Sequence, residues 1–159
     1  MPRIILYLVA FLLSVTGSAQ AKSLKKEIKK GIETFFEGLH KGDSTIIKKT
    51  LYKDIKIQTT HTNKKEENFL KTKSMFKLLS SIANKKVDII YKEKLLFYDI
   101  KVDGNLASGW TPYEFYLNGT FSHCGANSFQ LFNNNRKWEI IYLVDMRRRD
   151  NCKALKDKK

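Results

Sequence analysis

The second half of the chain alternates apolar and polar residues over four long segments, and this pattern constrains the fold most strongly. A period of two is typical of β-strands, and the segments are separated by short turns that include Asp-Gly and Asn-Gly. Consecutive strands joined by such short turns pair antiparallel. The sequence therefore predicts a meander with strands at 94–102, 106–117, 120–132 and 137–147.

The residues before this meander follow a helical period. Apolar residues recur every three or four positions from Leu24 to Leu39, which predicts a helix with one apolar stripe. Gly42 predicts the end of this helix, and Asp43 or Ser44 predicts the cap of a short second one, which ends near Leu51. Three further elements are predicted: a strand at 55–59, a loop at 60–68 and a helix at 74–83. Helices followed by a meander indicate one α+β domain.

The first 21 residues have the order of a secretory signal peptide. Arg3 precedes an apolar run from Ile4 to Leu13, and small residues end in Ala19-Gln20-Ala21. A-x-A is a usual cleavage site, and the run is shorter than the ~20 residues that span a membrane. We therefore expect residues 1–21 to be removed and the mature protein to be periplasmic or secreted. An uncleaved anchor is the alternative.

The chain is strongly basic, with 30 Lys and Arg against 16 Asp and Glu and a formal net charge of +14. The lysines are spread over every segment, and the dense runs are RRR at 147–149 and the C-terminal tail 153–159. Scattered charge on an exported chain indicates a solvated surface. We therefore expect no nucleic-acid partner, and no membrane partner after the signal peptide is removed.

The cysteines and histidines do not form a metal-binding pattern. The three histidines are far apart, neither cysteine has a partner at metal-ligand spacing, and no phosphate-binding glycine loop is present in the sequence. We therefore expect neither a metal nor another cofactor. An even number of cysteines in an exported chain is typical of disulfide bonds.

The stretch NGTFSHCGANSFQL (118–131) places polar residues on an apolar strand face. In a period of two, His123 and Asn127 share one face with Phe121 and Phe129. Buried polar side chains of this kind form either a satisfied core network or the lining of a pocket. This face is therefore the best candidate for a functional site.

Turn positions set the register between the strands. The two-residue Asn-Gly turn puts Glu114 opposite His123. A four-residue turn at 133–136 puts Asn127 opposite Tyr142, and it puts Asp145 on the other face. The predicted face consists of Trp110, Glu114, Tyr116, Phe121, His123, Asn127, Phe129, Ile140 and Tyr142.

Two interpretations of this face stay open. It could be a sealed core in which Glu114 pairs with His123 and Asn127 bonds to Tyr142. However, a buried ion pair commonly stabilises a fold less than apolar residues of equal volume. Four polar groups in an aromatic frame therefore favour a pocket for a small-molecule ligand that is largely apolar or aromatic.

The opposite face of the same strands is also apolar. A small domain covers one sheet face with its own helices, so a second apolar face requires another cover. We expect a second copy of the chain to supply it. The homodimer would form through Tyr113, Phe115, Leu117, Ile141 and Leu143.

The order of these elements resembles the nuclear transport factor 2-like superfamily, which includes the SnoaL-like proteins. The resemblance is closest to uncharacterised exported bacterial members, through residues 110–125, 127–131 and 137–149 followed by Cys152. It implies an α+β fold in which three N-terminal helices pack on a strongly curved antiparallel sheet. This cone-shaped, cystatin-like roll would span residues 22–152, enclose a pocket and often form dimers.

The resemblance leaves the function open, because the superfamily contains isomerases, dehydratases, cyclases and binding modules. One hypothesis is ligand binding without turnover. A second is acid–base catalysis by Glu114 and His123, with Asp145 as an alternative carboxylate. A third is a protein-interaction module. The ligand-binding residues would be Trp110, Tyr116, Asn127, Phe129 and Tyr142.

The resemblance, the export signal and the even cysteine count also predict a Cys124–Cys152 disulfide. Two free thiols are the alternative. Closing a loop of about 29 residues would stabilise the fold by roughly 3–4 kcal/mol on the loop-entropy model.

Cleavage after Ala21 can be tested directly. Protein recovered from the exporting host should begin at Lys22, because signal peptidase cuts after the second small residue of A-x-A. Intact-mass analysis measures the new N-terminus. A mature mass that retains residues 1–21 would contradict the prediction.

Overall fold

The structure is a computed structural model that describes residues 2–135 and 137–152, with the backbone alone for residues 2–19. The predicted basic tail, 153–159, lies outside the described residues. The helices are α1 (Pro2–Lys41), α2 (Ser44–Lys48) and α3 (Met75–Ala83). The strands are β1 (Leu51–Thr62), β2 (Asn68–Lys73), β3 (Tyr91–Leu95), β4 (Asp99–Asp103), β5 (Leu106–Leu117), β6 (Thr120–Asn133) and β7 (Trp138–Arg148).

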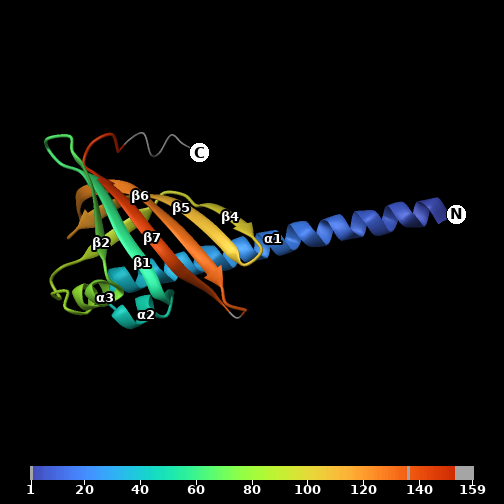
Figure 1. The fold of residues 1–159 in the computed structure, drawn as a ribbon, viewed down its shortest axis with the longest axis horizontal. Coiled ribbons are helices and arrows are strands. Elements are labelled where there is room, and N and C mark those ends of the chain that lie inside the picture. Colours follow the sequence, from blue (N-terminus) through green and yellow to red (C-terminus); the bar gives the residue numbers. More distant parts are fainter. Residues whose placement is uncertain (1, 136, 153–159) are drawn as a thin grey trace.

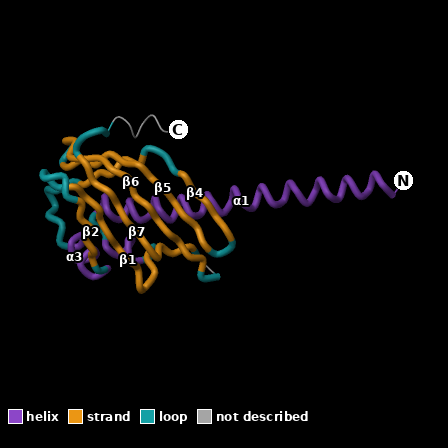
Figure 2. The backbone as a smooth tube through the Cα atoms, turned by 45° about the horizontal axis from the view of Figure 1, so that its top comes forward, coloured by secondary structure: helices purple, strands orange, loops and turns teal. Residues whose placement is uncertain are grey.

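In the described chain, the strands form one curved sheet in the order β2-β1-β7-β6-β5-β3, and β4 also pairs with β5. All neighbouring strands are antiparallel except β1 and β7, which run parallel. The sheet wraps around the C-terminal half of α1, while the N-terminal half projects away from it (Figure 1, Figure 2). The predicted α+β class, with helices on a curved, mostly antiparallel sheet, is confirmed. None of the described helices meets the length and hydropathy needed to cross a membrane.

An apolar stripe on α1 joins the helix to the concave face of the sheet. Its residues recur with the helical period and pack around Phe129 of β6. Gly109 of β5 allows this close approach, because a Cβ there would lie 3.0 Å from the Cδ1 atom of Ile32. The buried stripe consists of Ile28, Ile32, Phe35 and Phe36.

The ends of the helices follow the predicted capping signals. Gly42 has a positive φ of 70°, and Asp43 caps α2 by accepting hydrogen bonds from the backbone N–H groups of Thr45 and Ile46. Ser74, which the sequence analysis placed inside the third helix, caps α3 in the same way by accepting from the N–H of Lys77. The signal at 42–43 is local, which explains why the sequence predicts it correctly.

Three strand predictions need correction. The first strand is longer than 55–59, because β1 pairs with β7 on one side and with β2 on the other. The second is β2, which was not predicted. The segment 94–102 is two strands, β3 and β4, which pair with β5 on either side of Pro112. The break between them is held by a hydrogen bond from the N–H of Leu96 to the carbonyl of Pro112.

The β5–β6 hairpin has the predicted Asn-Gly turn but not the predicted register beyond it. Tyr116 lies opposite Phe121 as expected, whereas Phe115 lies opposite His123. Ser122 is therefore an extra residue, a β-bulge that shifts the pairing by one. Glu114 consequently lies opposite Cys124, and the predicted Glu114–His123 pair is wrong.

A second bulge changes the β6–β7 register. Asn133 lies opposite Trp138, so this turn is displaced from its predicted position, and the pairing shifts again around Ile141. Asn127 therefore lies opposite Asp145, and the predicted pairing with Tyr142 is wrong. Each one-residue shift moves the following side chains to the other face of the sheet.

The register shifts also move part of the predicted dimer surface to the concave face. Tyr113 is only 1% exposed and Leu143 is part of the core that packs against the helices. Both residues belong to the concave face. The homodimer stays a prediction, but these two residues are not available to form its interface.

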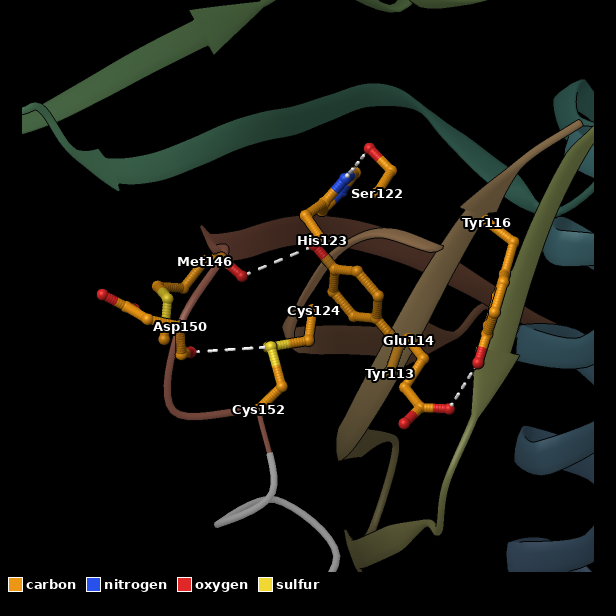
Figure 3. The surroundings of a disulfide bond; sticks show 9 residues. All are labelled: Tyr113, Glu114, Tyr116, Ser122, His123, Cys124, Met146, Asp150 and Cys152. Atoms are coloured by element: carbon orange, nitrogen blue, oxygen red, sulfur yellow. Dashed lines mark hydrogen bonds between the residues drawn. A yellow bond between two sulfur atoms is a disulfide. The ribbon is translucent and has the colours of Figure 1, made fainter. Parts of the chain in front are cut away.

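Cys124 and Cys152 are joined by a disulfide, the pair that the sequence analysis predicts (Figure 3). The bond spans 28 residues and ties the segment after β7 back to β6. Figure 3 shows Tyr113 crossing β6 near this point, with its hydroxyl directed at the carbonyl oxygen of Met146.

Gly125 is the position where this packing tolerates no side chain. A Cβ there would collide with the carbonyl oxygen of Met146 and would lie 2.8 Å from the hydroxyl of Tyr113. Gly125→Ala should therefore lower the free energy of unfolding by about 3 kcal/mol, measured by urea denaturation.

Gly31 supplies the matched control, because a Cβ at that helical position meets nothing within 4 Å. Gly31→Ala should stabilise the protein by up to about 1 kcal/mol through helix propensity. Equal effects of the two substitutions would contradict the proposed collision.

Candidate functional site

The concave face of the sheet is apolar around Phe129 and becomes polar toward the β5–β6 turn. Tyr113, Asn127 and Asp145 continue the inward-facing positions on the adjacent strands β5, β6 and β7. The parallel pairing of β1 with β7 adds Thr59, which lies opposite Asp145. Together these four residues form an inner polar cluster, a name kept below.

Asp145 is the centre of the inner polar cluster. Its Oδ1 accepts a hydrogen bond from Thr59 Oγ1 at 2.5 Å, and its Oδ2 accepts from the Tyr113 hydroxyl at 3.4 Å. The Nε–H of Arg147 also donates to Oδ2. All three partners are donors, so the carboxylate is an acceptor in every contact.

Tyr113 is a fixed donor in this arrangement. Burial raises the pKa of its hydroxyl well above the ordinary value, and the carboxylates of Glu93 and Asp145 raise it further. The hydroxyl therefore keeps its proton at all physiological pH values. It donates toward Asp145 and toward the carbonyl oxygen of Met146.

Glu93, on β3, joins the inner polar cluster to a groove. Its Oε1 accepts a hydrogen bond from Asn127 Nδ2 at 2.7 Å. Burial raises the pKa of Glu93 to about 7; the bond from Asn127 lowers it and the charge of Asp145 raises it. The carboxyl group therefore exchanges its proton near neutral pH, which suits both acid and base chemistry.

The groove lies between α1 and the strands β3 and β4 and has a volume of about 420 Å³. Apolar surface comes from Phe36, Leu95 and Tyr98, and Glu93 supplies a carboxyl group. The other lining residues are Glu33, Glu37, His40 and Lys41.

His40 fixes the position of β3 relative to α1. Its Nε2 accepts a hydrogen bond from the backbone N–H of Glu93 at 2.8 Å. An imidazole nitrogen that accepts has no proton, so His40 is neutral with its proton on Nδ1. Burial lowers the pKa of His40, which agrees with this neutral form.

The structure separates the predicted site residues onto two faces. His123, Asn127, Phe129 and Asp145 lie on the concave face, and Phe129 belongs to the apolar core. The outer face holds Trp110, Glu114, Tyr116 and Tyr142.

The predicted catalytic pair of Glu114 and His123 is therefore wrong, because the bulge at Ser122 places the two side chains on opposite faces. Glu114 accepts a hydrogen bond from the Tyr116 hydroxyl at 3.0 Å, and Lys94 Nζ is 3.8 Å away. His123 stacks on Phe115 with ring centroids 4.8 Å apart.

Three functional candidates were missed by the sequence analysis: Glu93, Tyr113 and His40. Glu93 alternates with Tyr91 and Leu95 on one strand face, and this lone acid on an apolar face was the available signal. It was missed because the predicted strand began one residue later. Over the residues whose placement is described, no group of three or more metal-ligating side chains is assembled.

Comparisons with known proteins agree with this architecture. No protein-family model and no curated protein matches the sequence. Among solved structures, an NTF2-like protein with a cystatin-like fold from Novosphingobium aromaticivorans is 13% identical, with 85% of this chain and 88% of that chain covered and a TM-score of 0.66. The protein has the NTF2-like fold.

Two other structures extend this comparison. An NTF2-like protein of unknown function from Shewanella baltica is 18% identical, with 79% and 94% of the two chains covered and a TM-score of 0.58. A candidate dehydratase of the NTF2-like family from Streptomyces avermitilis is 10% identical, with 76% and 93% covered and a TM-score of 0.59. The NTF2-like fold supports a ligand-binding or enzymatic domain, and at these identities it does not assign the activity.

The face assignment of His123 can be tested by NMR titration. Burial and then Arg147 lower the pKa of His123 below 6.5, whereas Asp145 raises it. Asp145→Asn should therefore lower this pKa further.

The control is Glu114→Gln, which removes a carboxylate from the outer face and should leave the His123 pKa at its wild-type value. A decrease in Glu114→Gln that matches or exceeds the decrease in Asp145→Asn would contradict the register described above.

Proposed function

We propose that the protein is exported and binds a small molecule in the groove between α1 and β3–β4. The observation that carries this proposal is the position of Glu93, whose carboxyl group lines the groove and also bonds to Asn127. The groove volume of about 420 Å³ falls within the range of small-molecule sites. The disulfide supports the export part of the proposal, because such bonds persist in oxidising compartments.

The lining favours a ligand with a largely apolar or aromatic body. Phe36, Leu95 and Tyr98 offer the apolar contacts, and Glu93 offers one polar contact at the inner end. The acids Glu33 and Glu37 add little unbalanced charge, because Lys29 and Lys41 pair with them at 3.6 Å and 2.6 Å. Glu93 is therefore the residue that would select the polar group of the ligand at the inner end of the groove.

A second candidate function is acid–base catalysis at the same carboxyl group. A pKa of about 7 lets Glu93 take up and release a proton at neutral pH, which general acid–base catalysis requires. Asn127 would orient the carboxyl group through its hydrogen bond. The reaction would be of isomerase, dehydratase or cyclase type, as the resemblance implies, and one structural neighbour is a candidate dehydratase.

Binding of the neutral apolar dye Nile red tests the groove. The dye should bind saturably to the wild type, because apolar side chains line the groove. Its affinity should fall by about three- to tenfold as pH rises through 7, because ionised Glu93 opposes burial beneath an apolar molecule. Fluorescence titrations at a series of pH values measure this change.

Three variants separate the proposal from nonspecific dye binding. Leu95→Lys should abolish binding, whereas Leu106→Lys, outside the groove, should leave it unchanged. Glu93→Gln keeps the acceptor for Asn127 and should remove the pH dependence. Saturable binding that survives Leu95→Lys would place the dye elsewhere and refute the groove as the site.

A further inference from the structure

Several connections of the sheet meet at one end of the molecule. The parallel pair His61–Arg147 places the β1–β2 turn beside the end of β7. Leu117 lies opposite both Thr120 and Tyr91, so the β5–β6 turn lies beside the loop that precedes β3. We call these segments, 63–70, 84–92, 117–121 and 147–150, the loop end; the projecting N-terminal half of α1 points the other way (Figure 1).

Exposed apolar side chains concentrate at this loop end. Among the described residues, nine large apolar side chains are exposed, and six of these belong to the loop end. Val87 is 98% exposed and Ile90 is 61% exposed. Isolated exposed apolar residues are ordinary, but a group of them marks an interaction surface. The six are Phe69, Leu70, Val87, Ile90, Leu117 and Phe121.

Hydrogen bonds hold two of these segments together. The backbone N–H of Ile90 donates to Asn118 Oδ1 at 2.7 Å, and the N–H of Asn118 donates to the carbonyl of Ile90 at 2.9 Å. Asn118 and Gly119 both have positive φ angles, 50° and 78°, as a tight two-residue turn requires. The backbone at Ile90 is therefore fixed next to the Asn-Gly turn.

Cationic side chains surround the apolar tips. The acids of the loop end are Glu66, Glu67, Asp88 and Asp150, and the partly buried Glu93 lies beside it. They are outnumbered by Lys64, Lys65, Lys85, Lys86, Lys92, Arg148 and Arg149. Arg147 is not counted, because it pairs with Asp145.

We propose that the exported protein docks by its loop end on an anionic lipid membrane. Val87, Ile90, Leu117 and Phe121 would enter the interfacial layer, while the surrounding lysines and arginines contact the lipid headgroups. This inference departs from the expectation that the mature protein has no membrane partner. That expectation rested on the scatter of lysines along the sequence, and the fold brings some of them together with apolar tips.

A lipid surface fits these features better than a second copy of the chain. The centres of protein interfaces are depleted in lysine, whereas lysines here stand directly beside the apolar tips, with Lys86 next to Val87. A bilayer accepts separate apolar tips and attracts the cations around them.

The proposal can be tested by vesicle co-sedimentation of the processed protein, purified after export. Wild-type protein should bind vesicles that contain phosphatidylglycerol, and added salt should weaken this binding. Vesicles of phosphatidylcholine alone should bind it at least about tenfold more weakly, because they lack the anionic headgroups. Equal binding to both vesicle types, or binding to neither, would overturn the proposal.

Substitution of the apolar tips locates the contact. Val87→Ser combined with Ile90→Ser should weaken binding to anionic vesicles by at least about tenfold. The control, Leu106→Ser, removes an apolar side chain that is also exposed, at the β4–β5 turn at the other end of β5, and should have no effect. Equal losses in both variants would overturn the proposal.

Two further measurements keep the result interpretable. Thermal unfolding should be unchanged by Val87→Ser alone, because this side chain is 98% exposed, so lost binding in this variant reports the surface and not the fold. Sedimentation velocity of the wild type should show no self-association through the tips. A dimer that Val87→Ser with Ile90→Ser abolishes would assign the surface to a second copy and overturn the proposal.

Discussion

The contact between α1 and Phe129 is the interaction on which the rest of the fold depends. Phe35 and Phe36 meet Phe129 edge to face, with ring centroids 6.2 Å and 6.1 Å apart, and meet each other at 5.2 Å. Full burial of each such side chain contributes about 1.5–3 kcal/mol. The glycine at 109 lets the helix approach the sheet closely, and the sheet curves around the helix (Figure 2). Without α1, the apolar surface around Phe129 would lose its cover.

This contact also places the functional groups. Phe36 and His40 are one helical turn apart, so the residue that packs on Phe129 determines where His40 meets the backbone of Glu93. Residues of α1 in the same stretch form one wall of the groove, and β3 forms the other. The hydrophobic contact therefore positions α1 against the sheet, and the His40–Glu93 hydrogen bond fixes β3 at the other wall of the groove.

The local parts of this architecture could be predicted from the sequence, and the long-range parts could not. The stripe of α1, the cap at Asp43 and the Asn-Gly turn each depend on a few neighbouring residues, and all are present. The bulges at Ser122 and Ile141 depend on the twist and curvature of the whole sheet.

Their effect on the site was large, because a shift by one residue moves every following side chain to the other face. Without the bulges, counting from the turns pairs Glu114 with His123. With the bulges, the same count pairs Asn127 with Asp145. The hydrogen bond between Thr59 and Asp145 joins residues 86 positions apart on the parallel strands β1 and β7, and no local sequence pattern predicts it. The fold class was predictable because it needs only element types and order, whereas the site needs the register.

The effect of Glu93 on the stability of the fold favours a functional role for this residue over a structural one. Its pKa is raised from 4.5 to about 7, so the folded protein binds the proton more tightly than the unfolded chain does. Between these two values the folded state holds more protons, and the contribution of Glu93 to stability therefore falls as pH rises from 4.5 to 7. A glutamine would keep the acceptor for Asn127 without this loss.

A ligand that donates a hydrogen bond or presents positive charge to the carboxylate would recover part of the lost stability, since it binds the ionised form that burial disfavours. Binding of such a ligand would therefore be coupled to the release of the Glu93 proton.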